Sequence, residues 1–238
     1  MTVLPTKRDE AWRYSNIDAV AALWPVPLAT IVDVAAGETE TRHLIAENGI
    51  HDFAITVHAG ARMDFYVLNT APRYARIAID VTLHDGAHFE FGGVQIGGGA
   101  TNLEIITTVR HIEPNATSRQ TVRSVLGGTA TGTYLGKVAV ARDAQKTDSV
   151  QSVKAMLLTR TATANAKPEL EIYADDVKCA HGCAIGELDQ QAMFYLASRG
   201  IAPMEAQTLL LQAFVAEVFE GADASLEAAA LAALETLK

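Results

Sequence analysis

Three side chains that bind metals well stand close together in one short segment. Cys179, His181 and Cys183 are separated by single residues, and Asp175 and Asp176 precede them. If the segment is extended, the i, i+2, i+4 spacing places both thiols and the imidazole on one face of a strand. Thiolates and imidazole are ligands for iron, zinc and iron–sulfur clusters. The segment therefore predicts part of a metal site.

Three groups on one strand cannot close a tetrahedral site, so we expect a partner to supply the remaining ligands. The contrary hypothesis is that Val177 and Cys179 share a face turned into the core, where Cys179 is a small apolar residue. The other histidines show no ligand spacing; they are His43, His51, His58, His84, His88 and His111.

A cysteine nucleophile is a second chemistry that these residues allow. Cys179 or Cys183 could attack a substrate, with His181 as the base and Asp175 or Asp176 orienting it. However, side chains two residues apart on a strand point in parallel rather than toward each other. The sequence also lacks a G-x-S-x-G elbow. We therefore expect no catalytic residues in this chain.

The glycine-rich segments do not complete a nucleotide-binding motif. Gly136-Lys137 is similar to the end of a phosphate loop, but Thr131 stands where that motif has glycine and Val138 where it has Ser or Thr. The glycines at 97–99 do not continue into the dinucleotide fingerprint. We expect this chain to bind no nucleotide by itself.

The elements that position these residues fall into three regions. Residues 1–27 contain both tryptophans and predict a short helical or irregular lead-in. Residues 28–186 contain short runs of Val, Ile and Thr punctuated by glycine, which predict strands. The runs lie at 77–83, 87–91, 103–109, 120–126, 133–140, 149–158 and 169–174. No helical-length segment interrupts them, so a sandwich, a barrel or a β-helix remains open.

Residues 187–238 change to a helical pattern. Asp189 and Gly200 bracket the first predicted helix, Pro203 and Gly221 bracket the second, and a third starts near Ser225. Apolar stripes follow the helical period; they comprise Leu211, Phe214, Val215 and Val218, then Leu226, Ala230, Ala233, Leu234 and Leu237. Such stripes most often pack on the chain's own body, although helices at one end of a β domain can also present a surface to a partner.

Composition limits the classes of function. The 238 residues are 49% hydrophobic and 20% charged, with a net charge of -9, which is globular composition on an acidic chain. An acidic surface argues against nucleic acids or anionic membranes as the main partners. No apolar run is long enough to span a bilayer, and the first residues lack a signal core. Two cysteines only, close in sequence, suit reduced thiols, so we predict a soluble cytoplasmic protein.

Longer motifs resemble the SufB/SufD family of the SUF iron–sulfur cluster assembly machinery. The most specific are PELEIYADDVKCAHG at 168–182 and FYLASRGI at 194–201, followed by the helix containing LLLQAFVAEVF. Upstream support comes from EAWRYSNI, TVRHIEPNATSRQ and GKVAVARDAQKTDSVQSVKAMLLT. The similarity runs from about Glu10 to Glu220, and the sequences of these motifs are closer to SufD subunits than to SufB.

The resemblance implies a mainly β fold, with a right-handed parallel β-helix core over 28–186 and a C-terminal helical subdomain over 187–238. It implies a scaffold subunit that is not an enzyme, whose core pairs with a SufB-type subunit or with itself. The C-terminal helices would dock a SufC-type ATPase. Cys179 and His181 would lie at the SufB interface as ligands for iron or for a transient iron–sulfur cluster.

Two departures from the family pattern accompany this resemblance. Family members usually have a small non-thiol residue at Cys183, so we assign it no role. The chain begins almost at its WRY motif, so we expect the N-terminal helical domain of longer members to be largely absent. The competing hypotheses are a stand-alone β-helix enzyme with a cysteine nucleophile and a purely structural β-helix module.

Overall fold

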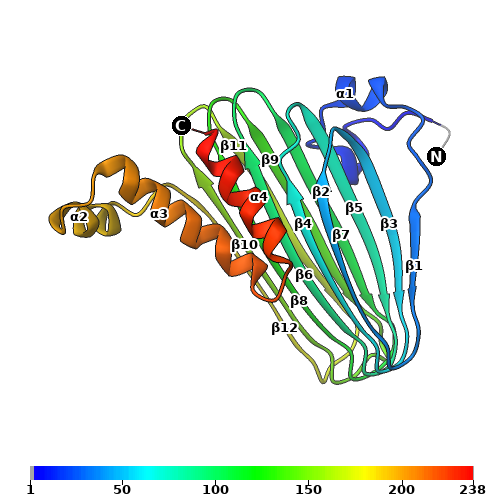
Figure 1. Ribbon diagram of the computed structural model, residues 1–238. Helices are drawn as coiled ribbons and strands as arrows, with labels where there is room; N and C mark the ends of the chain where they lie inside the picture. Colours follow the sequence, from blue (N-terminus) through cyan, green and yellow to red (C-terminus); the bar gives the residue numbers. More distant parts are fainter. Residues whose placement is uncertain (1–2, 238) are drawn as a thin grey trace.

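Parallel strands wind alternately between two facing sheets (Figure 1). The computed structural model describes residues 3–237. The first sheet contains, in spatial order, β1 (Thr30–Val34), β3 (Gly49–Val57), β5 (Tyr74–Leu83), β7 (Asn102–His111), β9 (Thr131–Val140) and β11 (Thr163–Ile172). The second contains β12 (Lys178–Gly186), β10 (Asp148–Leu157), β8 (Thr117–Leu126), β6 (His88–Gly97), β4 (Arg62–Asn69) and β2 (Thr39–Ala46). The chain is thus a β-helix of about five turns, which resolves the choice among the three β architectures.

Each strand pairs in parallel with the strand two places along the chain. In the second sheet His88 pairs with Thr117, Thr117 with Asp148, and Asp148 with Lys178. One coil therefore takes about 30 residues, which lies within the usual range for solenoid repeats. Residues that share a register position form rows that cross the coils at right angles to the strands.

The space between the two sheets is filled by inward-facing side chains. In the first coils these side chains are apolar; they include Val57, Phe65, Ile79, Val81, Phe89 and Ile105. The alternation at 77–83 is the signature of this burial, because Ile77, Ile79, Val81 and Leu83 all face inward and are buried. The core is a two-sided stack, with each coil covering the one before it.

Three α-helices follow the last strand: α2 (Gln190–Ser198), α3 (Pro203–Ala216) and α4 (Ala224–Glu235). The Asp189 side chain accepts hydrogen bonds from the Gln191 and Ala192 amides, so the predicted N-cap is confirmed. Gly200 has a φ of 85°, a left-handed conformation that suits glycine beyond a helix end. The second predicted helix begins at Pro203, and its helical segment ends just before Gly221, which has a φ of 87°. The α-helical part is shorter than this segment. It ends at Ala216 and tightens into a 3-10 turn, η2 (Glu217–Phe219), which buries Val218 and Phe219 against the sheet.

Helices α3 and α4 lie across the outer face of the second sheet (Figure 1). Their buried residues pack on Tyr66, Leu68, Val94, Ile96 and Val125; they are Leu211, Val215, Leu226, Ala230 and Leu234. Both predicted apolar stripes therefore pack mainly on the chain's own body. Helix α2 differs, because it projects beyond the sheets and none of its residues is buried (Figure 1).

The lead-in segment is held on the outer face of the first sheet. It contains a 3-10 turn, η1 (Glu10–Trp12), and a short helix, α1 (Ile17–Ala22). The Arg76 guanidinium lies 3.8 Å from the centre of the Trp12 ring and 2.7 Å from the Glu104 carboxylate. Ser15 donates a hydrogen bond of 2.8 Å to the same carboxylate. The Arg76 and Glu104 side chains are almost fully buried, and Trp12 and Ser15 of the lead-in segment contact them.

Gly92 lies where the helical layer packs closely on the second sheet. A Cβ added there would lie 2.7 Å from the Val218 carbonyl oxygen and 2.7 Å from Cδ1 of Tyr66. Backbone cannot yield as a side-chain tip does, so Gly92→Ala should lower the free energy of unfolding by about 1–3 kcal/mol. Urea denaturation measures this change. Gly186→Ala, where a Cβ would meet no atom within 4 Å, is the matched control and should change stability little. Equal effects at the two positions would contradict the close-packing account.

Candidate functional site

The last coil leaves one end of the β-helix open. Strand β12 pairs with β10 and strand β11 pairs with β9, and among the described residues no strand pairs with their outer edges. Nearly all residues of β12 are exposed, whereas the equivalent residues of β10 alternate between buried and accessible. The inner face of this coil is accessible because no further coil is stacked on it.

Cys179, His181 and Cys183 all lie on this inner face. In the register they pair with Ser149, Gln151 and Val153, which are buried inside the β-helix. The prediction that the three side chains share one face of an extended segment is therefore confirmed. Across the coil, the matching inner positions of β11 are apolar; they are Ala166, Pro168, Leu170 and Ile172.

The open coil holds ligands but not a closed metal site. Alternate residues of a strand are about 7 Å apart, so neighbouring ligands cannot converge on one ion without further groups. Among residues 3–237 no group of three or more His, Cys, Asp or Glu side chains is placed to hold a metal. That another molecule supplies the remaining ligands stays a prediction.

The two thiols differ in their surroundings. Cys179 is half-buried beside Val177 and packs near Val138, Val140 and Ala144, while Cys183 is exposed. The core hypothesis for Cys179 thus holds in part. Partial burial raises the pKa of the Cys179 thiol, and a nearby carboxylate, Asp148, adds to this, while a backbone hydrogen bond at Ser149 opposes it. Although Cys183 is exposed as a residue, partial desolvation of its thiol also raises its pKa.

These surroundings disfavour a cysteine nucleophile. Raised thiol pKa values reduce the thiolate fraction, whereas catalytic cysteines need it increased. Asp176 lies in the turn before β12, where its carboxylate pairs with Lys146 and its amide donates to Gln145 Oε1. It is therefore engaged at the opposite end of the segment from His181. The arrangement supports ligation better than nucleophilic attack.

Buried polar side chains lie directly behind the ligand strand, and sequence reasoning missed them. The Ser118 and Ser149 hydroxyls are 2.8 Å apart, and His111 Nε2 lies 3.0 Å from Ser118 Oγ. The row Ser118–Ser149–Cys179 continues to the open end. These residues recur about 30 positions apart, so a search for similarity at the solenoid period could have found them.

A second row, formed by Gln120, Gln151 and His181, runs beside the first and contacts polar side chains of the facing sheet. Thr107 donates to Gln120 Oε1 at 2.8 Å, and the Tyr134 hydroxyl lies 2.9 Å from Thr107 and 3.2 Å from Gln120. Gln151 lies next in this row and His181 follows it. The β-helix interior thus changes from apolar in its early coils to polar behind the ligands.

The fold and the candidate site together define a class of protein: a two-sheeted parallel β-helix with thiol and imidazole groups on an open terminal coil. The family model "SUF system FeS cluster assembly, SufBD core domain" matches residues 46–214, from the end of β2 into α3. The chain belongs to this family, and the resemblance drawn from its motifs is confirmed.

Curated relatives agree with this assignment. The chain is 39% identical over 114 residues to the iron–sulfur cluster assembly protein SufD of Escherichia coli, which covers 48% of the chain and 27% of that protein. It is 32% identical over 154 residues to a SufBD family protein of Synechocystis, covering 64% and 34% of the two chains. It is 40% identical over 108 residues to Protein ABCI7, chloroplastic, of Arabidopsis thaliana, covering 45% and 23%. The matches therefore span about a quarter to a third of these relatives.

The helices carry one further finding about membranes. Within residues 3–237, no helix combines the length and the apolar character that a bilayer crossing requires. The cytoplasmic location stays a prediction, since one relative carries a chloroplastic name.

The buried His111 makes stability depend on pH. Burial lowers its pKa from 6.5 to about 4, although a backbone hydrogen bond with Ala116 opposes the shift. The folded state therefore favours the neutral ring, and its stability is full above pH 6.5 and falls as the pH drops toward 4. The loss by pH 4 should be about 3 kcal/mol. Urea denaturation at several pH values gives the slope of the free energy of unfolding against pH. This slope should be reduced in His111→Gln and retained in His51→Gln, which removes a partly exposed ring. An unchanged slope in His111→Gln would contradict the assignment.

Proposed function

We propose that this chain is a scaffold subunit of an iron–sulfur cluster assembly complex, with no turnover of its own. Its terminal coil pairs with a SufB-type subunit, and its helical arm docks a SufC-type ATPase. Cys179 and His181 supply ligands to iron or to a nascent cluster, which is cargo shared with the partner. The observation that carries this proposal is the position of both ligands on the inner face of an unpaired coil.

The terminal coil is better suited to strand pairing than the opposite end of the β-helix. An exposed edge offers unpaired N–H and C=O groups to another chain, unless charge or short length protects it. At the opposite end β1 has only 5 residues, and β2 carries Glu40 and Arg42. Strand β12 has 9 residues and no charged side chain after Lys178. A partner coil seated there would cover the apolar face of β11 and complete the coordination of Cys179 and His181.

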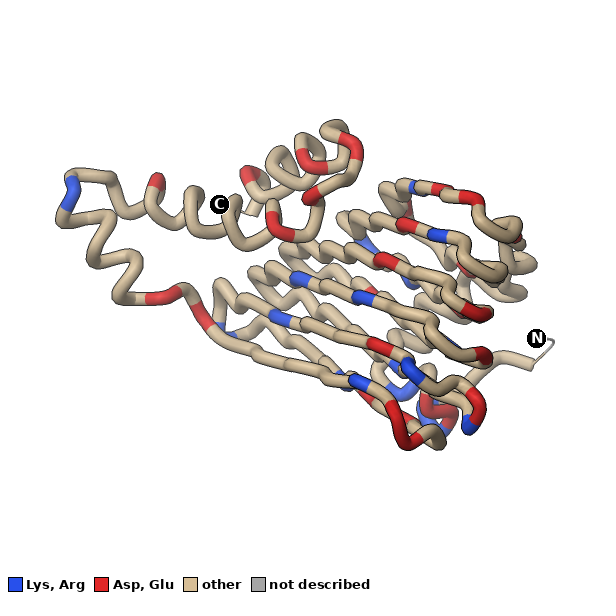
Figure 2. Tube along the Cα trace, turned by 90° about the horizontal axis from the view of Figure 1, so that it is seen from below, with Lys and Arg blue, Asp and Glu red and all other residues tan. Residues whose placement is uncertain are grey.

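The segment formed by α2 and the first turns of α3, which we call the helical arm, offers the ATPase a separate surface. In α2 the side chains of Phe194 and Tyr195 are 77% and 56% exposed, and Met204 in α3 is 68% exposed. Figure 2 shows that the arm projects from the coils and carries few charged residues. Exposed aromatic and Met side chains are typical of protein interfaces. The docking surface is therefore assigned to the arm rather than to the packed face of α4.

A buried arginine connects the helices to the sheet that carries the ligands. Arg123 donates to Glu217 Oε2 at 3.0 Å from Nη2 and to the Ser152 carbonyl at 2.9 Å from Nη1. Ser152 pairs in register with Gly182, between His181 and Cys183. A force applied to α3 by ATP-driven closure of docked ATPase subunits would pass through Glu217, Arg123 and β10 to the ligand strand. In this proposal the contact couples ATP hydrolysis by the docked ATPase to the accessibility of Cys179 and His181 at the terminal coil.

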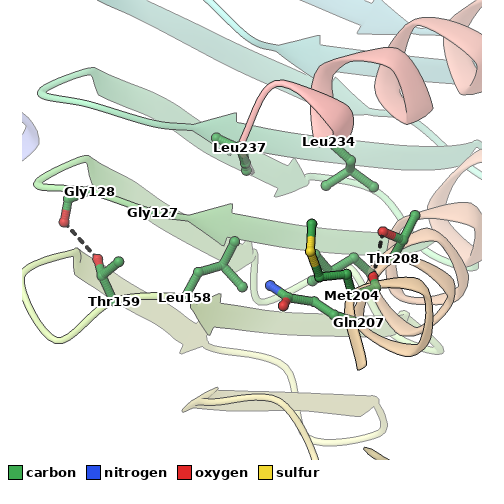
Figure 3. A pocket seen from close by; sticks show the side chains of 10 residues that line it. Gly127, Gly128, Leu158, Thr159, Met204, Gln207, Thr208, Leu234 and Leu237 are labelled. Atoms are coloured by element: carbon green, nitrogen blue, oxygen red, sulfur yellow. Dashed lines mark hydrogen bonds between the residues drawn. The ribbon is translucent and has the colours of Figure 1, made fainter. Parts of the chain in front are cut away.

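The N-terminal half of α3 is held less closely than its C-terminal half. A cleft separates it from the sheet, with Met204 and Gln207 on the helix side and Leu158 and Thr159 on the sheet side (Figure 3). The buried Leu211 also lines the cleft, and one turn further along the helix Val215 is buried against the sheet. The arm can thus tilt about its packed end without loss of the main helix–sheet contact.

Single substitutions of the ligands test the central claim. Cys179→Ala and His181→Ala should each lower the affinity of the assembled complex for cluster by at least the 10- to 100-fold typical of outer-shell changes. Reconstitution with iron and sulfide, followed by absorption spectroscopy, measures the yield. Cys183→Ala is the control on the same strand and face and should leave the yield unchanged. Normal yields in both ligand variants would favour the purely structural module.

Docking through the helical arm is tested separately. Phe194→Asp and Tyr195→Asp each place a charge on the exposed aromatic surface and should reduce co-purification of the SufC-type ATPase by at least tenfold, since central aromatic residues contribute about 2 kcal/mol or more. Ala232→Asp, on the exposed side of α4, should retain the partner. Retention by the arm variants would refute this surface, and loss in Ala232→Asp alone would move it to α4.

A further inference from the structure

Gln151 has half of its amide uncommitted in the interior of the β-helix. The side chain is 1% exposed, and its Nε2 makes long contacts of 3.4 Å with Gln120 Oε1 and with the Tyr134 hydroxyl. Its Oε1 is shielded from solvent and has no hydrogen-bond partner among the described residues. A buried acceptor left without a donor destabilises the fold, so a donor within reach should be captured.

The His181 side chain is exposed and makes no hydrogen bond to Gln151 in the structure, but rotation of its ring toward the interior would bring an N–H to this acceptor. His181 is the register partner of Gln151 on the neighbouring strand, and both side chains lie on the inner face. Neighbouring strands are about 4.8 Å apart, so side chains at paired positions lie side by side. Gln151 is buried, and among the described strands those of the terminal coil separate it from the open end. The side chains of that coil must therefore cover it, and an imidazole N–H is a strong donor.

The rows that end at Cys179 and Cys183 differ from the row that ends at His181. The Ser149 hydroxyl behind Cys179 already pairs with Ser118, and the residue behind Cys183 is the apolar Val153. The uncommitted acceptor thus lies only behind the imidazole, which is the one ligand of the three whose tautomer and ring orientation need to be set.

We propose that Gln151 is a positioning residue: its Oε1 accepts a hydrogen bond from one ring N–H of His181 and directs the other ring nitrogen toward the open coil. Metal-binding histidines usually donate their second N–H to such a partner, which fixes the tautomer and raises ligand basicity. The ligand role of His181 rests on the proposed function above. The hydrogen bond itself does not, and it can be observed in the chain without metal.

The tautomer of His181 is the quantity to measure. In the full chain labelled with ¹⁵N-histidine, at about pH 8.5 where an ordinary ring with a pKa of about 6.5 is neutral, long-range ¹H–¹⁵N spectra report which ring nitrogen carries the proton. His181→Ala assigns the signal. We expect a single tautomer in the native chain and a mixture in Gln151→Met, which keeps the volume but removes the acceptor. Ser149→Ala, two residues away and on the same face of β10, is the control and should leave the His181 signal unchanged.

The outcomes separate positioning from a merely structural role. Gln151→Asn keeps the amide but shortens its reach, so it should also give a mixture, and it serves if the Met variant does not fold. A tautomer mixture in the native chain, or a single tautomer retained in a folded Gln151 variant, would overturn the proposal. If the tautomer changes as expected while His181→Ala leaves cluster yield unchanged, the hydrogen bond stands and the ligand role is refuted.

Discussion

The structure depends on one constraint, which is the parallel register between successive coils. Backbone hydrogen bonds fix each strand two places from its partner, so residues about 30 positions apart fall into rows that continue through the molecule. Every row inside the β-helix is covered by the next coil until the last coil is reached. There the rows end in side chains that no described strand covers, and these include Cys179 and His181. These proposed ligands are accessible because the stacking of coils ends there, not because a pocket surrounds them.

The two outer faces of the β-helix are stabilised by different means. The second sheet is covered by α3, η2 and α4 through apolar packing, with Arg123 as a buried polar contact to Glu217. The first sheet carries the lead-in segment, which shields the ion pair between Arg76 and Glu104. Removing one member of such a buried pair leaves an uncompensated charge and commonly costs 3–5 kcal/mol. Both terminal regions also reach the last coils, through Arg123 to Ser152 on β10 and through Glu10 to Lys167 on β11. They lie on the outer faces and leave the inner face of the open coil accessible.

Much of this fold could be predicted from the sequence, and the omissions have physical causes. The runs from 77 to 174 correspond to β5 through β11, because Val, Ile and Thr are concentrated in them and glycine separates several of them. The earlier strands were not located individually. In β4 the last five residues are buried on both faces, which removes the alternation, and β2 has little burial to impose one. The shared face of the three ligands followed from spacing alone. Their partners Ser149 and Gln151 did not, because finding them requires the coil length, and that length varies from turn to turn.

The change of the interior from apolar to polar has a cost that the position of the ligands explains. Buried hydroxyl and amide groups contribute little net stability even when paired, and one left unpaired destabilises the fold. An apolar interior like that around Phe65 and Phe89 would stabilise the last coils more. However, it would offer no hydrogen bond to an imidazole on the neighbouring strand. Polar side chains such as Gln120, Tyr134 and Gln151 lie just where the rows reach the ligand strand. Under the proposal that Gln151 orients His181, this loss of stability accompanies control over the orientation of a group at the open end.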